Sequence, residues 1–257
     1  MMLDSLKVRL FGNDDELAER AARDVAGRIL GVLESKAEVN LILSGAESQE
    51  KFLQALAGSA GIDWSRVNYF AVDEFHAPGM DAAHAVAAQP LRILSGLALK
   101  SRNVMDFAAS DIEEERARYE GLIRRNRADI ACLGIGVSGH IAFNEPGQTD
   151  FDGSDDVRII RVEDHSVGQL MQDPNFRELG EIPRKAITVT IPYLMRCPFV
   201  SVVVPYAIKA PIVRDLFRSS GLSVDLPATI LKRKEGAVLY LDRDSFSLCE
   251  GGVGGTA

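Results

Sequence analysis

The sequence predicts an α/β fold, with a doubly wound, mainly parallel sheet flanked by helices in a Rossmann-like arrangement and a lid segment. Two observations support this prediction. Short apolar runs alternate with segments of helical periodicity along most of the 257 residues, and such alternation favours parallel strands joined by right-handed crossovers. No internal repeat and no linker rich in Pro, Gly or Ser divides the chain. We therefore expect a single domain over residues 1–257.

Continuous apolar runs predict the strands, and capping residues with helical periodicity predict the helices. In the first helix, Asn13 is suited as the N-cap, the next turn is acidic, and apolar residues recur to about Leu33. Ser110 and Glu113 form a capping box for a helix that ends near Arg125. Two further helices are expected around 52–56 and at 207–218. The expected strands are 8–10, 39–43, 67–72, 130–135, 186–191, 199–204 and 237–241.

One long segment breaks this alternation. From about 151 to 183 the chain is polar and has few periodic apolar positions. A stretch of this kind inside a compact domain is often a lid or a binding loop, so we expect a lid here. The Gly-rich end at 250–257 is expected to be a flexible tail.

Composition excludes several classes of partner. The net charge of −8 is poorly suited to nucleic acid, although it leaves room for a small phosphorylated ligand in a locally positive pocket. The three cysteines are far apart and form no CxxC pair, which favours a reducing compartment and argues against a zinc cluster. The N-terminus has no signal-peptide pattern, and the most apolar stretch, 198–208, is too short to cross a bilayer. We therefore expect a cytoplasmic protein without a membrane or nucleic-acid partner.

Ligands of doubly wound sheets bind at the carboxyl ends of the strands, where three groups of residues are notable. Asp73 and Glu74 end the strand at 67–72. Adjacent strand residues point to opposite sides, so only one of these carboxylates is expected to face a cleft. Taken alone, such a pair is more often a solvated turn.

The second group follows the strand at 130–135. Its glycines allow a ligand to approach the backbone closely. His140 comes directly after them, and Glu145 lies close enough in sequence to orient it. A histidine beside a carboxylate is suited to proton transfer near neutral pH. The alternative is a glycine-rich turn with a structural histidine.

The third group combines two helix starts. Ser44 and Gly45 open a helix, whose unpaired amides are suited to hold an anion. Lys209, near another helix start, could supply a positive charge to a phosphate. A capped helix and a surface lysine are the alternative interpretations.

In combination, these segments resemble the glucosamine-6-phosphate deaminase family. The specific part is Gly-Ile-Gly-Val-Ser-Gly-His-Ile-Ala-Phe-Asn-Glu-Pro-Gly at 134–147, which is similar to the family signature. Asp73-Glu74, the segments 183–190 and 226–231, and Lys209 are similar to family positions in the same order. The resemblance covers about the whole chain. The broader superfamily includes 6-phosphogluconolactonases, from which the motif at 140–146 separates this sequence.

The resemblance implies conversion of glucosamine 6-phosphate and water to fructose 6-phosphate and ammonia. Asp73 would move a proton from C2 towards C1, His140 would assist ring opening, and Glu145 would orient His140. It implies a small sugar phosphate as the partner, no metal and no cofactor. Family members occur in more than one assembly, which leaves a homo-oligomer open. The implied substrate and phosphate contacts are Ser44, Gly45, Ala46, Gly136, Ser138, Gly139 and Lys209, with Glu74 as a further candidate.

Four positions depart from the family pattern. Ser138 stands where the family usually has Asp, and Glu47 lies in the phosphate loop. The Arg that the family lid supplies to phosphate is not evident, and Gln172 or its neighbours fall at that place. The Ala-rich region between Ala77 and Ala88 lacks the family's Ser-Tyr pair, and His84 in that region is either a substitute contact or a surface residue. Three functions therefore stay open: an amino-sugar-phosphate deaminase or isomerase, with the family substrate or an altered one; a sugar-lactone hydrolase in which a histidine activates water; and a non-catalytic sugar-phosphate sensor.

Overall fold

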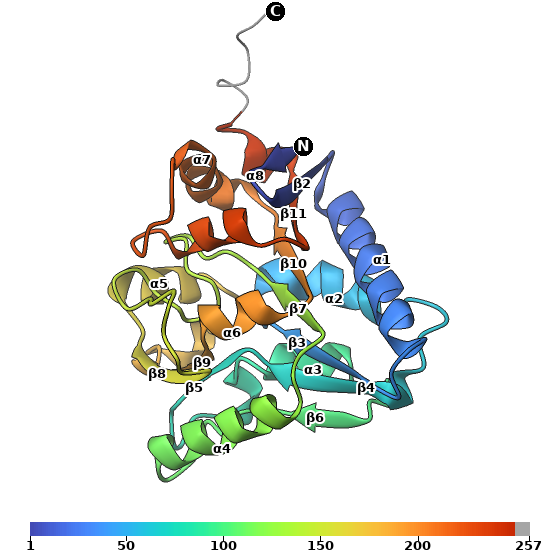
Figure 1. Ribbon diagram of the computed structural model, residues 1–257. Helices are drawn as coiled ribbons and strands as arrows, with labels where there is room; N and C mark the ends of the chain where they lie inside the picture. The colour runs from blue at the N-terminus through green and yellow to red at the C-terminus, as the bar shows by residue number, and fades with distance from the viewer. Residues whose placement is uncertain (250–257) are drawn as a thin grey trace, which may run out of the picture.

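The computed structural model describes residues 1–249, without the side chains of His165 and Gln169, and the tail predicted at 250–257 lies outside the described residues. An eight-stranded sheet forms the centre, in the order β1-β2-β11-β10-β7-β3-β4-β6 (Figure 1). All its neighbouring strands are parallel except the β1–β2 pair. The strands are β1 (Met2–Leu3), β2 (Leu6–Phe11), β3 (Val39–Leu43), β4 (Val67–Ala71), β6 (Ser101–Asn103), β7 (Ile130–Leu133), β10 (Phe199–Val204) and β11 (Ala237–Asp242). The predicted α/β, mainly parallel architecture is confirmed.

Helices cover both faces of this sheet. One face packs against α1, α2 and α3, and the other against α4, α6, α7 and α8. The helices are α1 (Asp14–Leu33), α2 (Glu50–Ala57), α3 (Ala88–Ile93), α4 (Ile112–Arg125), α5 (Asp164–Leu170), α6 (Ile191–Arg196), α7 (Ala210–Arg218) and α8 (Arg243–Phe246). Short 3₁₀ helices lie at Glu47–Gln49, Trp64–Arg66, Ala82–His84, Arg177–Leu179, Ala207–Lys209 and Pro227–Arg233.

The continuous apolar runs arise because the central strands are buried on both faces. In β3, Leu41 and Leu43 belong to the core under α1 and α2, whereas Ile42 belongs to the core on the opposite face. In β7, Ile130 and Ala131 divide between the two cores in the same way. A strand with two buried faces reads as an unbroken apolar run, which is the pattern that the sequence shows.

A second, three-stranded sheet corrects one part of the prediction. Strands β5 (Asp73–Phe75), β9 (Lys185–Val189) and β8 (Val157–Arg161) pair antiparallel, and with α5 they gather at the left in Figure 1. The run predicted at 186–191 is thus a strand, but it does not belong to the parallel sheet. The chain leaves β4 at Val72, whose carbonyl accepts the amide of Val189 (2.9 Å), and enters the second sheet at Asp73.

One local prediction also changes. Asp111, and not Ser110, caps α4, and its carboxylate accepts the amides of Glu113 and Glu114 (2.8 and 3.2 Å). The segment 151–183, where a lid was expected, contains β8 and α5. Its buried apolar side chains, Ile160, Val162, Phe176 and Ile182, pack with Phe75, Val86, Phe143 and Ala186 in a third core. Among the described residues, no helix is long and apolar enough to cross a membrane.

Candidate functional site

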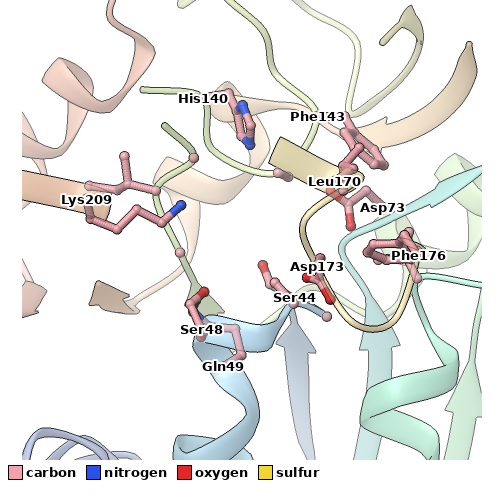
Figure 2. Close-up of a pocket in the computed structure, with 17 residues that line it drawn as sticks. Ser44, Ser48, Gln49, Asp73, His140, Phe143, Leu170, Asp173, Phe176 and Lys209 are labelled. Atoms are coloured by element: carbon pink, nitrogen blue, oxygen red, sulfur yellow. Dashed lines mark hydrogen bonds between the residues drawn. The ribbon is translucent and has the colours of Figure 1, made fainter. Parts of the chain in front are cut away.

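A pocket lies at the carboxyl ends of β3, β7 and β10, beside the start of β5. Figure 2 shows side chains from these separate segments pointing into it. Ser44 follows β3, His140 follows β7, Lys209 follows β10, and Asp73 begins β5. The crossovers of the fold therefore bring residues from distant parts of the sequence to one place. The described residues that line the pocket are Ser44, Gly45, Ala46, Ser48, Gln49, Asp73, Val86, Gly134, Ile135, Gly136, His140, Ala142, Phe143, Leu170, Asp173, Phe176 and Lys209.

The glycine-rich loop after β7 forms a tight seat for the imidazole of His140. A Cβ on Gly136 would lie 2.0 Å from Nε2 of His140, so a larger residue there would displace the ring. The amide of Gly136 also donates to the carbonyl of His140 (3.0 Å). Gly139 has φ +85°, which favours glycine, and a Cβ there would meet Leu226 at 2.4 Å. The loop thus holds the histidine against the floor of the pocket.

Three side chains meet Nδ1 of His140 on the side away from Gly136. The hydroxyls of Ser138 and Ser166 lie 2.9 and 3.3 Å from it, and Oε2 of Glu145 lies 3.4 Å from it. Glu145 is fully buried. A carboxylate can only accept a proton here, so this arrangement favours a proton on Nδ1 and leaves Nε2, above Gly136, as the acceptor. Nε2 is the nitrogen suited to exchange a proton with a ligand.

Asp73 and Glu74 are both buried but face different surroundings. Asp73 lines the pocket with 6% of its surface exposed. Burial, followed by the charge of Glu74, raises the pKa of Asp73 well above its usual range, and the amide of Phe143 opposes this shift. A carboxyl group with a raised pKa can accept and return a proton near neutral pH.

Glu74 points away from the pocket and holds a neighbouring loop. Its carboxylate accepts the amides of Phe75, Val86 and Ala87 at 2.7–3.0 Å. Burial raises the pKa of Glu74 to about 7, and these three amides oppose the shift. The loop is packed tightly against Gly45, since a Cβ there would lie 2.3 Å from the carbonyl oxygen of Val86. Glu74 therefore supports the wall of the pocket.

Around the loop after β3 the pocket is lined by Ser44, Ala46, Ser48, Gln49, Lys209 and Asp173, and we call this part the distal end. Lys209 reaches it because the chain turns sharply at Tyr206 (φ +80°), whose amide donates to Asp242 (3.0 Å). Lys209 is 4% exposed, and its amino group has no hydrogen bond or ion pair to any described residue. Burial lowers the pKa of Lys209 to about 8, although the charges of Asp173 and Glu47 oppose this shift.

Asp173 enters the distal end from the segment 151–183. Its Oδ2 accepts the amide of Glu47 (3.2 Å), at the start of the 3₁₀ turn that leads into α2. Burial raises the pKa of the Glu47 carboxyl, as do the charges of Asp173 and Glu50, and Lys209 lowers it. A carboxylate of the chain itself therefore lies on the loop that was expected to hold phosphate.

The structure brings most of the predicted site residues together. Ser44, Gly45, Ala46, Asp73, Gly136, His140 and Lys209 line the pocket. Ser138, Gly139, Glu145 and Glu74 lie outside its lining and contact or support residues that form it. His84 is partly buried, and its Nδ1 lies 3.0 Å from the carbonyl of Asn175.

Sequence reasoning missed the contributions of Ser166, Gln49 and Asp173. Ser166 and Asp173 belong to a segment without a clear periodic pattern, and no sequence signal placed Ser166 beside His140. Asp173 is the neighbour of Gln172, where the family resemblance placed the missing Arg, so its charge was the available signal.

Comparison with known proteins shows the family of this chain. The model of the family of glucosamine-6-phosphate isomerases and 6-phosphogluconolactonases matches residues 12–240, and the chain belongs to this family. The glucosamine-6-phosphate deaminase of Bacillus cereus (strain G9842) is 33% identical over 189 residues, covering 73% of this chain and 70% of that protein. The corresponding enzyme of Bacillus thuringiensis (strain Al Hakam) is 32% identical over 189 residues, with the same coverage of both chains. These matches confirm the resemblance seen in the sequence.

Solved structures of known proteins share the fold of this chain. A monomeric glucosamine-6-phosphate deaminase superposes with a TM-score of 0.82 at 25% identity, covering 95% of this chain and 100% of that one. A 6-phosphogluconolactonase from Thermotoga maritima shares the fold, with a TM-score of 0.71 at 18% identity over 92% of this chain and 99% of the other. The protein is thus an enzyme-family member whose relatives act on sugar phosphates.

Proposed function

We propose that this protein is a deaminase and isomerase of the glucosamine-6-phosphate deaminase type, with an altered substrate. In this reaction an amino sugar and water give a ketose and ammonia. The observation that carries the proposal is that Asp73 and His140 line one pocket, each with surroundings suited to proton transfer. Both groups are needed because the reaction has two stages, ring opening and proton transfer between adjacent carbons.

His140 would act in ring opening. The proton of the anomeric hydroxyl leaves, the bond from C1 to the ring oxygen breaks, and a proton reaches that oxygen, giving an aldehyde at C1. Nε2 of His140 would carry this proton. The contacts of Nδ1 with Ser138, Ser166 and Glu145 support this role, because they orient the ring.

Asp73 would act on the open chain. It would remove the proton from C2 and deliver it to C1, while a proton of the amino group passes to the C1 oxygen, so that C1 becomes a hydroxymethyl group and C2 an imine. Water would then add to C2, and ammonia would leave, so that a ketone remains. The deep burial of Asp73 supports this role, since it raises the pKa towards the range in which a carboxyl group can both take up and release a proton.

The segment 151–183 would serve as the lid of this site. Leu170, Asp173 and Phe176 of this segment line the pocket, whose volume is about 80 Å³. Pockets that hold small molecules usually measure about 300–1,000 Å³. A sugar would therefore enter after the segment moves outward, with the loop at Ser44–Ala46 and Lys209 binding the end of the sugar away from C1.

Ammonia release from a panel of amino sugars, with and without a 6-phosphate, tests the proposal. Asp73→Asn should lower kcat by about 10²-fold or more, because it removes a general base and keeps the size of the side chain. Glu74→Gln is the matched control, since Glu74 is the adjacent buried carboxylate outside the pocket lining. It should keep a larger part of the activity per folded molecule.

Turnover of Asp73→Asn equal to that of the wild type would contradict the assignment. Hydrolysis of sugar lactones without ammonia release from any amino sugar would replace it with the lactonase function.

A further inference from the structure

The distal end of the pocket combines hydrogen-bond acceptors with one cation. Lys209 is the only Lys or Arg among the described residues that line the pocket. The carboxylate of Asp173 lines the same part of the pocket, and its charge raises the pKa of Lys209, as does the charge of Glu47, an exposed residue outside the lining. The lining of the distal end thus carries one negative and one positive charge. A phosphate dianion would place further negative charge beside Asp173.

The carboxylate of Asp173 is held in its position by neighbouring groups. Its Oδ1 accepts the amide and the side-chain nitrogen of Asn175, at 2.9 and 2.8 Å. Its Oδ2 accepts the amide of Glu47 at 3.2 Å. Figure 2 shows Asp173 pointing into the pocket, with Lys209 on the other side. One backbone donor of the loop, the amide of Glu47, is therefore already bonded to an anionic group of the protein.

Gln49 supplies a second and independent acceptor. Its side chain is 1% exposed and lines the pocket. Its Nε2 donates to the carbonyl of Val203 (3.1 Å) and to the hydroxyl of Ser48 (3.2 Å), which fixes the orientation of the amide. Its Oε1 is buried and has no partner among the described residues. A buried acceptor without a partner is unfavourable, and a ligand that donates a hydrogen bond would satisfy it.

A hydroxyl group fits these surroundings, whereas a phosphate does not. A hydroxyl both donates and accepts, so it can donate to Asp173 or Gln49 and accept from Lys209. A phosphate dianion only accepts, and it would leave Gln49 unpaired and lie beside Asp173. We propose that the distal end binds the uncharged hydroxymethyl end of an amino sugar, and that Asp173 determines this preference over the 6-phosphorylated sugar. This inference rests on the proposed function.

The test compares ammonia release from glucosamine and from glucosamine 6-phosphate. The wild type should give the higher kcat/KM with glucosamine. Asp173→Arg should shift the ratio of the two kcat/KM values towards the phosphorylated sugar by about 10²-fold, as expected when a charge-assisted contact replaces a repulsive one. Glu178→Arg is the matched control, because Glu178 is an exposed carboxylate of the same segment outside the pocket lining. It should leave the ratio unchanged.

Different outcomes separate this inference from the proposed function. A wild type that prefers the phosphorylated sugar, with a ratio that Asp173→Arg does not move, would overturn the inference and leave the function intact. If neither sugar releases ammonia, the proposed function fails, and calorimetry with the same two sugars decides the inference through their relative affinities. If Asp173→Arg does not fold, Asp173→Asn decides instead. It should shift the ratio in the same direction by a smaller factor, and an unchanged ratio would overturn the inference.

Discussion

The burial of Lys209 predicts a stability that depends on pH in a defined way. Its pKa is about 8 in the folded protein, compared with 10.5 for an ordinary lysine. Below pH 8 Lys209 is charged in both states, and its burial then destabilises the folded protein. The difference between the two pKa values corresponds to a loss of about 3 kcal/mol in the free energy of unfolding. As the pH rises from 8 to 10.5, the folded protein releases its proton before the unfolded chain does, so this destabilisation disappears. Lys209→Met keeps the length of the side chain and removes the charge.

We expect Lys209→Met to be more stable than the wild type by about 3 kcal/mol at pH 7 and by less than about 1 kcal/mol at pH 10. Urea unfolding of both proteins across this pH range measures the difference in their free energies of unfolding. Groups that titrate in the same way in both proteins do not contribute to this difference. Lys232→Met is the matched control. Lys232 is also 4% exposed, but its amino group donates to the carbonyl and hydroxyl of Ser219. Its removal should destabilise the protein. A constant difference between wild type and Lys209→Met from pH 7 to 10 would refute the reasoning.

Two further predictions concern the chemical end of the pocket. Because the pKa of Asp73 is raised on folding, wild-type stability should fall as the pH rises from the ordinary aspartate range of about 4 towards the raised pKa, whereas Asp73→Asn does not titrate there. The stability advantage of Asp73→Asn in urea unfolding should therefore grow as the pH rises above about 4, and a shrinking advantage would contradict the burial argument. Gly136→Ala places a methyl group 2.0 Å from the resting position of Nε2 of His140, so it should displace the ring and lower kcat by about 10²-fold. Circular dichroism should show a folded protein, and wild-type turnover would mean that the ring position is not critical.

The main sheet could be predicted because its signal is local. Strands buried on both faces give unbroken apolar runs, and α1 has a well-defined start at Asn13, whose side chain accepts the amide of Glu16 (2.9 Å). The second sheet could not be assigned in this way. Its strand Lys185–Val189 has the same apolar composition as a parallel strand, and only its two partners, which both lie more than 20 residues earlier in the chain, make it antiparallel. Pairing of this kind is a tertiary property that periodicity does not report.

The site was predictable where a motif carries it. The loop at 134–147 and the strand ends point to His140, Asp73 and the loop at Ser44, because parallel strands bring their carboxyl ends to one edge. The lid contributions were not predictable, since Ser166 and Asp173 reach the pocket through the packing of Phe176 and its apolar neighbours in the third core. That packing depends on contacts with residues distant in sequence, which the sequence does not display as a pattern.

The two ends of the pocket are connected through Glu74. The strand that presents Asp73 to the substrate also carries Glu74, which holds the amides of Val86 and Ala87. The carbonyl of Val86 in turn lies so close to Gly45 that no side chain fits there, and Gly45 belongs to the loop of the distal end. A change in the protonation of Glu74 would therefore loosen the loop at 85–87 and, through it, shift the loop of the distal end.

Because the pKa of Glu74 is about 7, Glu74→Gln should weaken the dependence of KM on pH between 6 and 8 more than that of kcat. A pH profile of KM that is the same in Glu74→Gln and in the wild type would show that the two ends are independent.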